Sequence, residues 1–68
     1  MTRMAVTPIW RLWEYAMAIQ AEPGLPEHAR SELIAAVQRA ARILLQNVKP
    51  EHLGTAQALL EEIEKLRA

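Results

Sequence analysis

The sequence contains no cysteine, no aspartate and no phenylalanine, and only two glycines among its 68 residues. A chain without cysteine can form neither a disulfide nor a thiolate metal site, which are common ways to stabilise a small domain. No apolar run approaches the roughly 18 residues of a membrane span, and the first ten residues lack the apolar region of a secretory signal. We therefore expect one soluble domain, residues 1–68, with a cytoplasmic location.

An excess of charge of either sign is also missing, because eight Lys and Arg residues balance eight Glu residues. Nucleic-acid-binding proteins gain affinity by setting Lys and Arg against phosphates, so zero net charge disfavours a nucleic acid as the main partner. Twelve alanines and nine leucines are present instead, and both residue types favour helices. This amino-acid composition fits a designed helical protein as well as a small natural one.

Three prolines stand where helices are expected to begin, because the first helical position needs no backbone N–H. They are Pro8, Pro26 and Pro50. Read from each proline to the next helix breaker, the sequence predicts helices over about residues 8–22, 26–47 and 50–67. Thr7 is the expected N-cap of the first. The predicted fold class is all-α, a three-helix bundle whose second and third helices form an antiparallel hairpin, with residues 1–7 as an N-terminal arm.

The second and third predicted helices each show one apolar sector on a helical wheel, as helices facing a core do. On the second helix, Leu33 and Val37 fall in this sector, and Gln38 and Arg42 are expected to face water. Ala36 and Ala40 have short side chains that would let a neighbouring backbone come close. The second helix is therefore the expected centre of the bundle.

The first predicted helix is unusual, because roughly 220° of its circumference is apolar where an edge helix of a bundle needs about 100°. The residues concerned are Trp10, Trp13, Tyr15 and Met17. A chain this short needs large side chains in its core, so core packing is the simplest interpretation. The apolar arc beyond what the core needs nevertheless predicts an interface, because Trp is enriched at binding hot spots. We expect a small interaction or scaffold module that self-associates through this helix, or that binds a helical or grooved partner protein.

The two histidines, His28 and His52, each lie two residues after a proline that begins a predicted helix, and Glu32 follows His28 by four residues. These three side chains are candidate metal ligands. One His-x-x-x-Glu pair supplies two ligands, whereas catalytic zinc takes three from the protein. Surface histidines are the simpler interpretation, and we expect no cofactor.

Two alternative functions stay open. A small nucleic-acid-binding regulator would use Arg30, Arg39 and Arg42, the arginines of the second predicted helix. An engineered catalyst or metal site on a helical bundle is the other alternative, although the sequence has no Cys or Asp and no Gly-rich phosphate loop. We identify no catalytic residue from the sequence.

Overall fold

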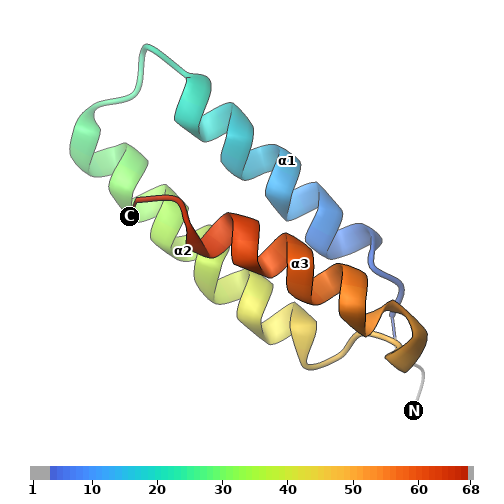
Figure 1. Ribbon diagram of the computed structural model, residues 1–68. Coiled ribbons are helices and arrows are strands. Elements are labelled where there is room, and N and C mark those ends of the chain that lie inside the picture. Colours follow the sequence, from blue (N-terminus) through green and yellow to red (C-terminus); the bar gives the residue numbers. More distant parts are fainter. Residues whose placement is uncertain (1–3, 68) are drawn as a thin grey trace.

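The computed structural model describes residues 4–67 and contains three α-helices. They are α1 (Thr7–Ala21), α2 (Glu27–Leu45) and α3 (Leu53–Glu64), with a 3-10 turn, η1 (Pro50–His52), directly before α3. Helices α1 and α3 run in one direction and α2 runs in the other, so the chain forms a rod of 40 × 17 × 15 Å (Figure 1). The predicted three-helix bundle, with α2 and α3 as an antiparallel hairpin, is confirmed.

The helix ends differ from the predicted ones by a few residues. The predicted cap at Thr7 is wrong: Val6 takes the cap position, and its carbonyl accepts hydrogen bonds from the N–H groups of Ile9 and Trp10 at 3.0 and 3.1 Å. Helix α2 stops at Leu45, and the Asn47 side-chain amide then donates to the carbonyl of Ile43 at 3.0 Å. The first turn of the third predicted helix is the 3-10 turn η1.

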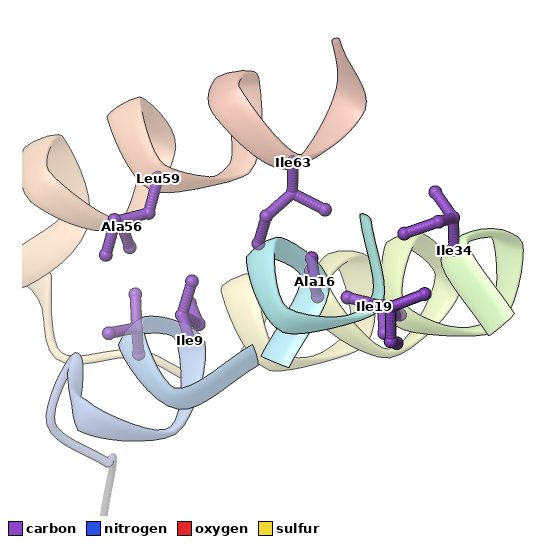
Figure 2. Packing of buried hydrophobic residues seen from close by; sticks show 10 residues of the cluster. Ile9, Ala16, Ile19, Ile34, Ala56, Leu59 and Ile63 are labelled. Carbon is purple, nitrogen blue, oxygen red and sulfur yellow. The ribbon is translucent and has the colours of Figure 1, made fainter. Parts of the chain in front are cut away.

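The core is a narrow stack of aliphatic side chains that recur every three or four residues on α2 and α3, and after seven and three residues on α1 (Figure 2). Helix α1 contributes Ile9, Ala16 and Ile19, α2 contributes Ile34, Val37 and Ala41, and α3 contributes Ala56, Leu59 and Ile63. Ile9, Ile34 and Ile63 are the largest fully buried side chains. Figure 2 shows Ala56 and Leu59 pointing toward Ile9, and Ile63 toward Ala16. The alanines let the helices approach closely.

The N-terminal segment is tied to the linker between α2 and α3. The N–H of Met4 donates to the carbonyl of Asn47 at 3.0 Å, and the N–H of Lys49 donates to the carbonyl of Met4 at 2.9 Å. Val48, between these two linker residues, is buried in the core. The predicted N-terminal arm is thus attached at residue 4, while its residues 1–3 lie outside the described part of the chain.

Gln38 does not face water, as the helical wheel predicted, but is buried between α2 and α3. Its Nε2 donates to the carbonyls of Ile63 and Leu66, at 3.1 and 3.0 Å. The last carbonyls of a helix have no partner within that helix, so this amide satisfies two acceptors at the end of α3. A buried amide that is satisfied in this way fixes where α3 ends against α2.

The contrast between Ile34 and Ile43, the same residue type on the same helix, tests the core assignment. Ile34 is fully buried, while Ile43 is 62% exposed. Ile34→Ala should lower the free energy of unfolding by about 2–5 kcal/mol, because it removes buried methyl groups and leaves a cavity. Ile43→Ala should change it by less than about 1 kcal/mol. Urea unfolding followed by circular dichroism at low protein concentration measures both, and equal effects would contradict the observed core.

The role of Gln38 is tested by Gln38→Ala with Gln57→Ala as the matched control, since Gln57 is an exposed glutamine of α3. Removing the Gln38 amide takes a donor from the carbonyl of Leu66 and leaves the carbonyl of Ile63 with backbone donors alone, at a cost of about 1–3 kcal/mol. Amide hydrogen exchange should also accelerate in the last turn of α3 in this variant. The control should leave both measurements unchanged. A Gln38→Ala variant as stable as wild type would refute the role of the Gln38 amide at the end of α3.

Candidate functional site

An apolar strip on the outside of α1 is the strongest candidate for a binding site. Trp10 and Trp13 lie on adjacent turns, with ring centroids 5.4 Å apart and ring planes inclined by 37°. Trp13 is half-buried and packs against the core, whereas Trp10 is 46% exposed. Met17, also half-buried, follows Trp10 by two turns on the same flank of the helix. These three residues, Trp10, Trp13 and Met17, are called the aromatic strip below.

Tyr15, the fourth residue of the predicted interface, lies on the other flank of α1. Five residues separate it from Trp10, which places it about 140° around the helix. The core positions Ile9 and Ala16 lie on the other, longer arc of about 220° that joins the two flanks. Tyr15 is 61% exposed and lies beside Glu14 in a shallow surface depression. One flat interface therefore cannot be centred on all four predicted residues, and the role of Tyr15 remains a prediction.

Helix α2 carries two exposed hydrophobic residues, Leu33 and Ile43. The helical wheel had assigned Leu33 to the core, yet the structure leaves it 39% exposed. Ile43 is 62% exposed. The spacing of Leu33, Ala36, Ala40 and Ile43, by three, four and three residues, is the signal in the sequence that could have separated this face from the core face.

Arg30, one of the candidate nucleic-acid-binding residues, forms hydrogen bonds with backbone carbonyls of its own chain. Its Nη1 donates to the carbonyls of Ile19 and Gln20 at 2.6 and 3.1 Å, and its Nη2 donates to those of Glu22 and Leu25 at 2.9 and 3.1 Å. These acceptors belong to the end of α1 and the turn after it. The guanidinium places a positive charge at the negative end of the α1 dipole, which stabilises this end.

The other two candidate arginines differ from each other. Arg42 forms a bidentate contact with Glu64 of α3, with Nε to Oε1 at 3.1 Å and Nη2 to Oε2 at 2.8 Å. These hydrogen bonds, and the negative charge of Glu64, raise the pKa of Arg42 above its ordinary value. Arg39 is exposed, and within residues 4–67 it forms no ion pair. The three arginines therefore do not form one basic surface.

The candidate metal ligands are far apart. His28 begins α2, and His52 ends η1, at the opposite end of the rod (Figure 1). The 19 residues of α2 span roughly 28 Å, so His28 and His52 of one chain cannot share a metal ion. His28 and Glu32 both lie on the exposed side of α2. Among residues 4–67, no group of three His, Cys, Asp or Glu side chains is placed to hold a metal ion.

Two further observations concern the chain as a whole. Of the helices between residues 4 and 67, none combines the length and the apolar character that crossing a membrane requires. Comparisons of the chain with protein-family models, with curated proteins and with solved structures find no match. The function must therefore be inferred from the exposed surface of the bundle.

Arg30 and Arg39, on the same helix, allow a test of the structural role of Arg30. Arg30→Ala should destabilise the fold, because it removes four hydrogen bonds to carbonyls at the end of α1 and in the turn after it. Arg30→Lys should restore only part of the stability, since an ammonium group cannot reproduce the planar fork of donors. Arg39→Ala is the control and should leave the thermal midpoint unchanged. If Arg30→Ala and Arg39→Ala melt at the same temperature, the assignment is wrong.

Proposed function

We propose that the protein is a small helical interaction module that self-associates through the aromatic strip of α1. The observation that carries the proposal is the Trp10–Trp13 pair, which lies at the surface and is partly exposed to solvent. Large aromatic side chains dominate the energetics of interfaces, because each can remove a large apolar area from water. The strip offers two such aromatic anchors, Trp10 and Trp13, and the apolar side chain of Met17 on two turns of one helix.

The surroundings of the strip favour a second copy as the partner. A twofold interface brings a surface patch against itself, so a patch edged by a single sign of charge would repel its copy. The strip is edged on its outer side by Arg11 and Glu14, whose side chains pair at 3.6 Å. Because this edge carries both signs, two copies can meet with Arg11 of one near Glu14 of the other. The site involves no group with chemical reactivity, which fits a binding or scaffold role.

The double substitution Trp10→Ala with Met17→Ala tests the proposal. It removes the two outer anchors and leaves Trp13, which packs against the core. Sedimentation equilibrium should show that wild type exceeds the 7.7 kDa of one chain and that the variant associates at least tenfold more weakly. Far-ultraviolet circular dichroism should show unchanged helical content in the variant.

Tyr15→Ala is the control, because it removes an exposed aromatic side chain from the opposite flank of α1. It should leave association through the aromatic strip unchanged. A wild-type protein that is a monomer with a cooperative thermal transition would contradict the proposal. A double variant that unfolds would instead show that Trp10 and Met17 stabilise the monomer.

A further inference from the structure

Helix α2 has a second apolar face that no other part of residues 4–67 covers fully. It consists of Ala29, Leu33, Ala36, Ala40 and Ile43, and it is called the α2 seam below. The spacing of these residues, alternately four and three, is the spacing of a coiled-coil seam. The core face of the same helix uses other residues, Ile34, Val37 and Ala41. The two large members of the seam, Leu33 and Ile43, are 39% and 62% exposed.

The shape of the α2 seam suits another helix. Ala29, Leu33 and Ala36 line a shallow depression, and the charged residues Glu32 and Arg39 stand at its edge. Short side chains at the centre allow the backbone of a second helix to come close, as in tightly packed helix pairs. Leu33 projects beside these alanines and could fill a matching depression on a helix of the same sequence.

The charges at the edge of the seam specify the direction of such a helix. Glu32 directly precedes the seam residue Leu33 and Arg39 directly precedes the seam residue Ala40, so the two charges lie seven positions apart on the same flank. The separation is about 10 Å along the helix axis, so they cannot pair with each other within one chain. Within residues 4–67, neither forms an ion pair. A partner helix that satisfies both must present the same two charges in reverse order.

We propose that a second copy of this chain docks on the α2 seam, with the two α2 helices antiparallel and Glu32 of each copy paired with Arg39 of the other. The twofold axis then passes close to Ala36, where the side chains are smallest. Leu33 of one copy faces Ala36 and Ala40 of the other, so a large residue meets small ones. A parallel pair would instead set Glu32 opposite Val37, a core residue, and leave both charges unpaired. This interface is separate from the aromatic strip of α1.

Charge reversal at these two positions tests the proposal directly. In Glu32→Arg, both pairs of the dimer become Arg against Arg, and in Arg39→Glu both become Glu against Glu. Each single variant should therefore associate at least tenfold more weakly than wild type. An equimolar mixture of the two variants should regain association as a heterodimer, because each Arg again faces a Glu. The double variant Glu32→Arg with Arg39→Glu should associate like wild type, with the charges exchanged.

Glu61→Arg is the matched control, because Glu61 is an exposed glutamate of α3 outside the seam. It should associate like wild type. Sedimentation equilibrium from about 10 μM to 1 mM covers the affinity expected of an interface formed by one helix face. Helical content measured on the same samples shows that the variants are folded. Recovery in the mixture cannot arise from altered stability of either monomer, so it reports contact between chains.

The outcomes separate this interface from the one proposed on α1. If the single variants associate like wild type, or if their mixture associates no better than each alone, the α2 interface is refuted. If the α2 interface is refuted in this way and Trp10→Ala with Met17→Ala still weakens association, the copies associate through α1 alone. Conversely, if only the charge reversals weaken association, the copies meet at α2 and the α1 proposal fails. A wild-type monomer over the whole concentration range refutes both.

Discussion

The bundle depends on two polar side chains of α2 that hold the ends of the other two helices. Arg30 donates to carbonyls at the end of α1, and Gln38 donates to carbonyls at the end of α3. Because α1 and α3 run in the same direction, the end of α1 lies beside the first turns of α2 and the end of α3 lies beside its middle (Figure 1). One helix can therefore fix the axial position of both neighbours. Carbonyls at helix ends must find donors, so these contacts also determine where α1 and α3 stop.

Close packing of the helices leaves Trp10 exposed and Trp13 only half-buried. The core is filled by isoleucine, valine, leucine and alanine, and the rod is only 17 × 15 Å across. Helices that approach through alanines have no room for an indole ring between them. The surplus of apolar surface on α1 thus follows from the narrowness of the core, as well as from the shortness of the chain.

The sequence predicted the number, order and type of the helices, because proline positions and apolar spacing are local signals. It did not predict the C-terminal end of α3 or the position of Gln38, because these depend on contacts between residues 25 or more positions apart. A local hint existed: Gln38 follows Ile34 by four residues, which places it at the edge of the core sector. The apolar arc of α1 was likewise visible in the sequence. Which part of that arc stays exposed depends on how α3 packs against α1, and no local pattern contains that information.

The aromatic strip and the α2 seam lie on different helices, and this has a consequence for binding strength. A dimer formed at the α2 seam would leave both aromatic strips open, related by the same twofold axis. Such a dimer would present two copies of one binding surface on a rigid body. A partner that carries two matching sites, or an array of further copies, would then bind with an avidity above the affinity of a single strip. A weak interface on α2 could therefore strengthen binding at α1 without contributing any contact to it.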